Sequence, residues 1–413
     1  MQLVKTSPST KALDLPEVRV RVASFLLRKD CLPCMRVSRA WFQDFAPAVW
    51  RTLDFANDAT AFAKVTPEVL DKYGGFVSQT LNISTFEHVQ ALQHVKVNSI
   101  TSMKIQLLED WLWRALLSDL LRRSHGSITS LTFGCHRPNP DTFEEQRRHA
   151  FYYMHVNDIF APFPSSTDPR SNASLGTRLK SLSLTHICLT REGFSSLLQY
   201  SPLLDELTLV RVMLICHKPG IPLYTGSALR YLTATFTQTV AFKSSNTEAM
   251  SALLLKNFKA LESCTLPAKT LAMSTTLGLV SHLESLTTIR ITGEIQDATS
   301  TQLLSVIMKL CRNLQVLSFE SLVCDVEAVE SYPWGCKELE ELRVRFKGLD
   351  TPQDIDGCIK KLCSSRRSSG IIVTRPMDTD TISSRVAQYL LQFKQLRTVW
   401  LGGRDYYLPR SPT

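Results

Sequence analysis

Two cysteines near the amino terminus, Cys31 and Cys34, have the spacing of a chemically active pair. A Cys-x-x-Cys segment can form a redox-active disulfide or supply half of a zinc site. A redox pair normally follows a strand and begins a helix, whereas a helical pattern that includes Leu26 and Leu27 precedes this one. The sequence has no second pair at zinc-binding spacing. We therefore expect neither redox chemistry nor a metal site at this segment.

The histidines and the short catalytic motifs make no stronger case for an enzyme. The nine histidines are scattered, and the pairs His88/His94 and His149/His155 are six residues apart. That step does not place two ligands on one helix face, as a four-residue step does. The sequence contains no phosphate-binding loop, dinucleotide-binding glycine pattern or nucleophile elbow. We expect a protein that is not an enzyme and needs no cofactor.

A leucine pattern, in contrast, recurs along the chain. Leu occupies positions one, four and six of two successive segments, Leu179-Leu182-Leu184 and Leu204-Leu207-Leu209. Side chains alternate along a strand, so positions four and six point to the same side. The pattern also starts at Ile100, Ile128, Leu229, Leu261, Leu286, Leu314, Leu339 and Leu396.

Most steps between these starts are close to one period of roughly 25–30 residues, which is typical of a leucine-rich repeat. The two longer steps, from Ile128 to Leu179 and from Leu339 to Leu396, are close to two periods each, and a weaker copy, Ser368-Ile371-Val373, divides the second. A strand and a helix at this period are the signature of such a repeat. The pattern predicts an α/β fold: a leucine-rich-repeat solenoid with a curved parallel sheet and outer helices. Segments that read as outer helices are 110–121, 251–260, 301–312, 355–363 and 383–393.

Composition fits such an array and excludes other classes. The chain has 413 residues, 44% hydrophobic and 21% charged, which is typical of a folded protein but long for one compact core. No segment approaches the roughly 20 apolar residues of a membrane span, and the first residues lack a signal-peptide core. We expect a cytoplasmic and/or nuclear protein with reduced cysteines. The net charge of +9 comes from scattered basic pairs, which argues against nucleic acid as the partner.

Residues 14–55 differ from the rest because their apolar residues have helical spacing. A first helix is predicted to begin at Pro16, a residue tolerated in a first turn, and to present Val18, Val22, Phe25 and Leu26 on one face. A second helix is predicted to begin at Asp30, and a third to end before Pro47. Three helices in about 40 residues have little core of their own, so they pack on the array or on a partner.

This helical segment resembles an F-box. The resemblance is carried by Leu15-Pro16-Glu17-Val18, Phe25-Leu26, Asp30, Val37-Ser38-Arg39, Trp41 and Pro47…Trp50. An F-box followed by leucine-rich repeats is the layout of the F-box/LRR proteins, and this chain is similar to the fungal-type ones. The resemblance implies that the helices bind the Skp1 adaptor of an SCF ubiquitin ligase, with its cullin, and that the repeats hold a protein substrate. It implies adaptor contacts by Leu15, Pro16, Val18, Val22, Leu26, Leu32 and Val37.

The alternative is that these helices only cap the first repeat. The chain would then be a leucine-rich-repeat scaffold that binds proteins without a ubiquitin role. An apolar face buried against the first repeats would favour this alternative, and an exposed face would favour the F-box interpretation.

The expected organisation has five parts. Residues 1–13 are flexible, 14–55 form the F-box-like domain, 56–75 form a linker, 76–405 form the repeat array and 406–413 form a tail. An insertion around 134–178, rich in Pro, Ser and Asn, interrupts the array. Inserted loops often carry recognition, but an insertion with no role fits the composition equally well.

The substrate surface follows from the strand alternation. If positions four and six face inward, positions three, five and seven face the concave side. Early strands carry mostly Ser and Thr there, whereas later strands carry Arg, Glu and Trp. Arginine and aromatic residues are enriched in binding hot spots. We predict substrate contacts by Tyr231, Arg290, Glu320, Arg343, Arg345 and Trp400, with a merely solvated face as the alternative.

Overall fold

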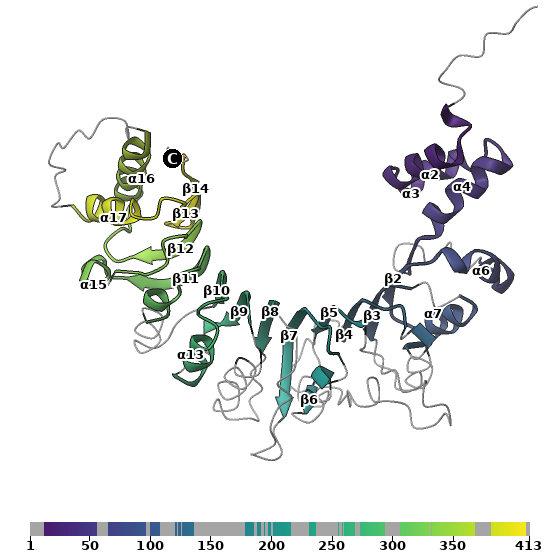
Figure 1. Ribbon diagram of the computed structural model, residues 1–413, viewed down its shortest axis with the longest axis horizontal. Coiled ribbons are helices and arrows are strands. Elements are labelled where there is room, and N and C mark those ends of the chain that lie inside the picture. The colour runs from purple at the N-terminus through teal and green to yellow at the C-terminus, as the bar shows by residue number, and fades with distance from the viewer. Residues whose placement is uncertain are drawn as a thin grey trace, which may run out of the picture. The chain divides into compact units, whose positions relative to one another are not determined.

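The computed structural model shows an α/β fold in which mostly parallel strands form two sheets (Figure 1). It describes residues 12–55, 65–95, 100–107, 120–121, 123–124, 126–135, 178–185, 188–190, 194, 197–199, 201–215, 231–236, 255, 258, 260–268, 273–293, 306–331, 333–367 and 381–409. The chain divides into two compact units, described separately below. Unit 1 contains the amino-terminal helices and strands β1–β5, and unit 2 contains strands β6–β14.

Three helices open unit 1: α2 (Pro16–Phe25), α3 (Arg28–Cys34) and α4 (Arg39–Trp50). Helix α2 begins at Pro16, as predicted. Helix α3 begins before the predicted Asp30, which lies in its first turn, so Pro33 falls inside the helix. Helix α4 is capped by Ser38, whose Oγ accepts a hydrogen bond from the Trp41 amide at 3.3 Å. It continues through Pro47, so the predicted end before this proline is wrong.

Five parallel strands follow in unit 1, each paired with the next in the chain: β1 (Thr52–Asp54), β2 (Gln79–Ile83), β3 (Ser102–Leu107), β4 (Ser130–Cys135) and β5 (Ser181–Thr185). Strand β1 lies before residue 76, so the sheet starts one strand earlier than predicted. The expected linker contains helix α6 (Pro67–Tyr73), and its residues 56–64 lie outside the described residues. The Tyr73 ring lies 5.4 Å from Trp50 of α4, so this segment is part of the packing.

Strand β2 departs from the leucine pattern because its backbone is irregular near Asn82. Val77, Thr80 and Ile83 are buried, so the third inward residue comes one position late. The pairing with β3 shifts register between Thr80 and Ile83, and Asn82 between them has a left-handed φ of 56°. Asparagine tolerates this conformation better than most residues because its side chain makes local hydrogen bonds. Here its Nδ2 donates to Asp54 Oδ1 of the neighbouring strand at 2.7 Å.

Unit 2 continues the same arrangement. Its strands are β6 (Cys188–Thr190), β7 (Glu206–Ile215), β8 (Tyr231–Phe236), β9 (Ser263–Pro267), β10 (Thr288–Thr292), β11 (Val316–Cys324), β12 (Glu341–Phe346), β13 (Thr398–Leu401) and β14 (Arg404–Tyr407). Strands β7 to β13 pair in parallel in chain order, and β6 pairs with the end of β7. Strand β14 turns back through Gly402 and Gly403, both with positive φ, and pairs antiparallel with β13. Residues 406 and 407 therefore belong to a strand, not to the predicted tail.

The core of both units consists of the predicted apolar positions. Every position-one, -four and -six residue whose side chain is described is buried. The strand register stacks equivalent positions on one another, as in Leu317 beside Leu342 and Leu342 beside Val399. The eight cysteines whose side chains are described are free, and burial raises the pKa of four of them, Cys311, Cys324, Cys336 and Cys358, to about 12.

Each of the two long steps of the repeat separates two strands that are neighbours in the sheet. Strand β4 pairs directly with β5, and β12 pairs directly with β13. The weak copy at Ser368-Ile371-Val373 lies outside the described residues. Most of the 134–178 insertion also lies outside them, although Gly134 and Cys135 end strand β4.

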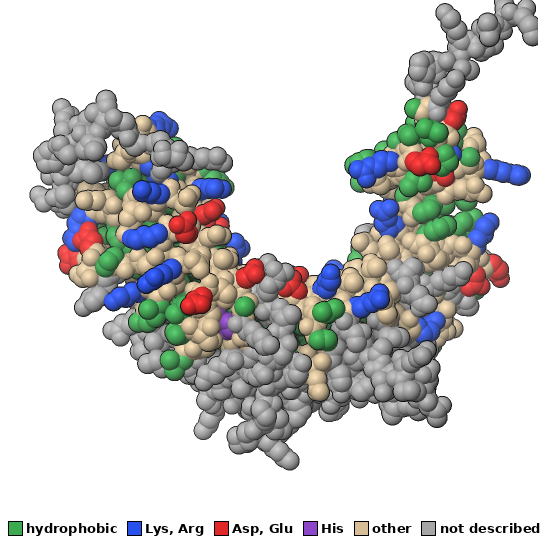
Figure 2. Space-filling model, in the orientation of Figure 1, with side chains coloured by type: hydrophobic (Ala, Val, Ile, Leu, Met, Phe, Trp, Pro, Cys, Tyr) green, Lys and Arg blue, Asp and Glu red, His purple; other side chains and the backbone are tan. Residues whose placement is uncertain are grey.

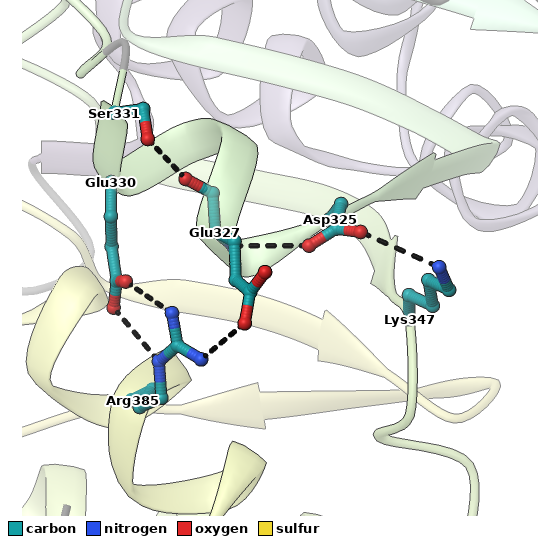
Figure 3. Close-up of polar contacts among 6 residues, drawn as sticks. All are labelled: Asp325, Glu327, Glu330, Ser331, Lys347 and Arg385. Atoms are coloured by element: carbon teal, nitrogen blue, oxygen red, sulfur yellow. Dashed lines mark hydrogen bonds and ion pairs between the residues drawn. The ribbon is translucent and has the colours of Figure 1, made fainter.

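Helices α13 (Met273–Val280), α15 (Val326–Ser331), α16 (Pro352–Arg367) and α17 (Ile382–Leu390) accompany the strands of unit 2. The predicted helix 355–363 lies within α16, and α17 covers residues 383–390 of the predicted helix 383–393. Of the predicted helix 301–312, residues 306–310 are helical. The predicted helices 110–121 and 251–260 lie mostly outside the described residues. Arg385 of α17 holds Glu330 and Glu327 of α15 at 2.5 and 3.0 Å (Figure 3). Buried Arg366 of α16 donates to the carbonyls of Phe393, Leu396 and Pro409. These hydrogen bonds connect α16 to the segment before β13 and to the segment after β14.

Because Leu317 is buried between neighbouring strands, Leu317→Ala should lower the free energy of unfolding by about 2–5 kcal/mol. Leu310 is exposed on the preceding helix, so Leu310→Ala should change it by no more than about 0.5 kcal/mol. Urea denaturation followed by circular dichroism measures both. Equal losses in the two variants would contradict the assignment of position four to the core.

Candidate functional site

The amino-terminal helices are held together by a small core and a buried ion pair. Ala23, Cys31, Phe45 and Val49 form the core, and the Trp41 ring stacks on Phe45 at 5.3 Å. Arg19 of α2 is buried, and its Nε lies 2.5 Å from Asp44 Oδ2 of α4. The Arg19 guanidinium also donates to the Leu13 carbonyl at 2.9 Å, so both its charge and its N–H groups find partners.

This packing fixes which side of α2 faces inward. Arg19 and Ala23 are the fully buried residues of α2, and Val22 packs against the core while half-buried. These three positions share one helix face by their spacing. The predicted stripe of Val18, Val22, Phe25 and Leu26 therefore lies at the margin of the core. Its two members at the carboxyl end of α2, Phe25 and Leu26, are left exposed.

Exposed apolar side chains are concentrated on these helices. Of the seventeen large apolar side chains that are exposed among the described residues, eight lie between Leu13 and Val37. We refer to six of them as the apolar surface: Leu15, Phe25, Leu26, Leu27, Leu32 and Val37. Figure 2 shows apolar side chains interspersed with Lys and Arg over the helices α2–α4. Contiguous exposed apolar patches often serve as interaction sites, so these side chains are candidates for contact with a partner.

The residues implied by the F-box resemblance divide into two groups. Leu15, Pro16, Leu26, Leu32 and Val37 are exposed and available to a partner. Val18 and Val22 are half-buried, and Val22 helps to build the core. The described residues thus present most of this set on the outside rather than against the first strands.

Two residues of the apolar surface, Phe25 and Leu27, were not among the predicted contacts. Phe25 belongs to the predicted apolar face of the first helix, and its side chain is 73% exposed. Its ring lies 4.8 Å from the Arg21 guanidinium carbon, four residues earlier on the same helix. Leu27 is the N-cap residue of α3 and is exposed at the turn between the helices. The sequence analysis missed Leu27 because it predicted a later start for α3, whereas α3 begins at Arg28.

The Cys31–Cys34 pair is part of the core of this module. Cys31 is fully buried, with its Sγ 3.9 Å from the Ala23 carbonyl oxygen, and Cys34 Sγ lies 3.5 Å from the Asp30 carbonyl oxygen. Burial, together with the neighbouring Cys34 and Asp30, raises the pKa of the Cys31 thiol. A raised pKa keeps the sulfur protonated, whereas redox chemistry and metal binding require a thiolate.

Two of the predicted substrate residues in unit 2, Arg343 and Glu320, contact each other. Arg343 donates from Nε to Glu341 at 2.8 Å, from Nη1 to Glu320 at 3.4 Å and from Nη2 to Asp405 at 3.3 Å. Burial alone would lower the pKa of Arg343, but its three carboxylate partners raise it. These contacts join strands β11, β12 and β14 on the side opposite the core. Arg343 is therefore held in place as part of the surface.

The other predicted substrate residues differ in how far their side chains are exposed to a partner. Arg290 is exposed, with Nη2 at 4.0 Å from Glu341, and Arg345 is exposed at the end of β12. Trp400 is only 9% exposed, so its indole offers little area to a partner. The side chain of Tyr231 lies outside the described residues.

A metal site and a membrane-spanning helix are two further features for which the described residues can be checked. No group of three or more His, Cys, Asp or Glu side chains could hold a metal ion there. None of the described helices has both the length and the apolar character needed to cross a bilayer. A scan against protein-family models finds no match to this chain, and a search of curated proteins finds none either.

Removing Asp44 should destabilise the amino-terminal helices, because it leaves the buried Arg19 charge without its partner. We expect Asp44→Ala to cost about 3–5 kcal/mol locally. Hydrogen exchange of the α2 and α4 amides measures the effect. The double variant Arg19→Met/Asp44→Leu, which removes both charges, should restore much of the protection, and exposed Asp30→Ala is the matched control. Unchanged exchange in Asp44→Ala would contradict a stabilising role for the pair.

Cys31 should resist alkylation in the folded protein, since its raised pKa lowers the thiolate fraction at every pH below that value. At pH 8, iodoacetamide should label half-exposed Cys34 well before Cys31, and both should react in urea. Peptide mass spectrometry reports the two sites separately. A Cys31 that reacts as fast as Cys34, or a disulfide between them under mild oxidation, would contradict this assignment.

Proposed function

We propose that this chain is the substrate-recognition subunit of an SCF-type ubiquitin ligase. In this proposal α2–α4 form an F-box-like module that binds a Skp1-like adaptor, and through it the cullin complex. The strands and helices that follow form a leucine-rich-repeat solenoid that binds a protein substrate. The chain carries out no reaction itself. It brings a substrate lysine close to the ubiquitin donor, and proximity raises the effective concentration.

The observation that carries the proposal is the exposure of the apolar surface on α2 and α3. A module with a core of four buried residues would gain stability by covering Leu26, Leu32 and Val37 with its own chain. It leaves them outside instead. The alternative, a scaffold whose helices merely cap the first repeat, expects these side chains to be buried against the first strands. Their exposure therefore supports adaptor binding over capping.

The repeat interpretation is supported by the register of the sheet. Strands β7 to β13 pair in parallel in chain order, and residues at positions one, four and six form the core. The proposed substrate surface is the opposite side of β10–β12, where Arg290, Glu320, Arg343 and Arg345 lie. A ligase of this kind acts in the cytoplasm or the nucleus, which is where we propose that this chain works.

Calorimetry of the full chain with a Skp1-like adaptor tests the adaptor assignment. Wild-type protein should bind, and the Leu15→Ala/Pro16→Ala variant should bind at least about tenfold more weakly, because exposed apolar anchors dominate such interfaces. Leu277→Ala, which removes an exposed leucine of α13, is the matched control and should bind like wild type. Absence of binding by wild-type protein, or equal affinity of the Leu15→Ala/Pro16→Ala variant, would overturn the proposal. If the adaptor binds as expected, affinity purification with mass spectrometry would identify the substrate.

A further inference from the structure

We propose that strand β14 is a docking edge for an extended segment of a partner protein, which joins the sheet as one further strand beside Asp405 and Tyr407. The identification of this partner as a ligase substrate rests on the proposed function, whereas the docking mode rests on the geometry of β14. The inference adds the way in which a substrate segment is held. It also adds a contact residue, Tyr407, that is not among the predicted substrate contacts.

Strand β14 is the last strand in the order of the sheet and lies beside β13 (Figure 1). The Leu408 amide donates to the Arg397 carbonyl at 2.8 Å, so Leu408 faces β13. In an antiparallel pair, residues that exchange hydrogen bonds with the neighbouring strand alternate with residues that do not. Counting back from Leu408, Tyr406 also faces β13, whereas the N–H and C=O groups of Asp405 and Tyr407 point away from it.

The neighbouring hydrogen bonds leave the outer edge of β14 open. The Thr398 amide donates to the Glu340 carbonyl at 3.0 Å, so Thr398 of β13 turns its amide away from its β14 neighbour, Tyr407. Within the part of the chain that the structure describes, no hydrogen bond satisfies the outward backbone groups of Asp405 and Tyr407. Another extended chain offers N–H and C=O groups at the matching spacing. Strand addition is the recognition mode that obtains its affinity from such groups.

The side chains of β14 also differ from those of a protected edge. Natural edge strands are usually blunted by charge, by proline or by a covering element. Tyr407 is 82% exposed, the largest fraction among the exposed large apolar side chains of the described residues. Asp405 is charged, but its Oδ2 lies 3.3 Å from Arg343 Nη2, which compensates the charge. Arg404 points to the other face, because side chains alternate along a strand. This edge therefore presents an uncovered aromatic ring beside a paired carboxylate.

The exposed ring specifies part of the chemistry of the partner. Side chains directly opposite each other on neighbouring strands interact, and an aromatic residue is favourable beside an aromatic or β-branched one. We expect the bound segment to place such a residue beside Tyr407. Asp405 connects the edge to Arg343, a predicted substrate residue of β12. A segment bound at β14 therefore continues the proposed substrate surface.

A second copy of this chain is the competing occupant, because it too can supply a strand. Strand β14 has four residues, and two of them turn their backbone groups outward. Two copies paired through β14 would share few hydrogen bonds, whereas stable interfaces bury at least about 1,200 Å². A substrate segment can run on from β14 and contact the side of the sheet where Arg343 and Glu320 lie. We therefore assign the edge to a substrate and not to a dimer.

The test uses peptides from a random library displayed on phage, selected on the full wild-type chain after depletion on the Tyr407→Pro variant. Proline removes the outward N–H of Tyr407, which edge strands tolerate because no bond to β13 is lost. A selected peptide should bind Tyr407→Pro at least about tenfold more weakly than wild type, because its carbonyl loses a donor. Tyr407→Ala keeps the N–H and loses the ring, so binding should weaken by about threefold. Leu277→Ala, an exposed leucine of α13, is the control and should bind like wild type.

Single N-methyl groups along the peptide give a readout that a merely structural role of Tyr407 would not produce. Each N-methyl group removes one N–H from the peptide. Strand addition predicts two sensitive positions, opposite Asp405 and Tyr407, with an insensitive residue between them. Fluorescence anisotropy of the labelled peptides measures every affinity, and circular dichroism checks that each variant is folded.

The outcomes separate this inference from the proposed function. If no peptide survives the depletion, or if the N-methyl scan shows no alternation, the docking edge is overturned while adaptor binding is unaffected. A wild-type dimer that Tyr407→Pro dissociates, measured by light scattering, would assign the edge to a second copy and overturn the inference as well. Failure of wild-type protein to bind a Skp1-like adaptor overturns the proposed function alone, because the peptide measurements need no adaptor. Folded Tyr407→Pro should bind the adaptor like wild type.

Discussion

A single strand with its following helix cannot bury its own apolar side, and most of this molecule follows from that constraint. Each inward residue at positions one, four and six is covered by the same position of the neighbouring strands. Parallel pairing in chain order satisfies the requirement because it keeps equivalent positions side by side, as Leu131 beside Leu182 shows. Polar residues are thereby left on the other side of the strands. The requirement also tolerates a local irregularity such as the bulge at Asn82, provided that Ile83 still reaches the core.

The amino-terminal helices obey a different constraint. Their core is too small to orient three helices by apolar burial alone, and a buried ion pair between Arg19 and Asp44 does part of this work. Because Arg19 points inward, the apolar stripe of α2 is turned toward the edge of the core. The same ion pair thus stabilises the module and leaves its most exposed aromatic residue, Phe25, on the outside.

The sequence was a reliable guide wherever a single physical requirement decided the outcome. The inward positions of the strands are such a case, because only burial determines them. The orientation of α2 was not predictable, since it depends on Arg19 meeting a residue 25 positions away, and the apolar spacing alone does not show which side of α2 faces the core. The extent of α4 was missed because Pro47 usually ends a helix. The low exposure of Trp400 depends on its tertiary surroundings, which the leucine pattern does not encode. Five of the predicted adaptor residues are exposed, as the F-box interpretation expects, whereas Val18 and Val22 are half-buried, and the partner stays a proposal.

Strand β14 has a consequence for how such a chain can change in length. It runs antiparallel and occupies the edge of β13, so a further strand at this end of unit 2 would meet β14 and not β13. Additional sequence lies between strands that remain neighbours in the sheet, between β4 and β5 and between β12 and β13. Variation in length can therefore accumulate inside the array without disturbing the stacking of its core. A chain of this design can acquire new surface loops while its register, and hence its set of inward residues, stays unchanged.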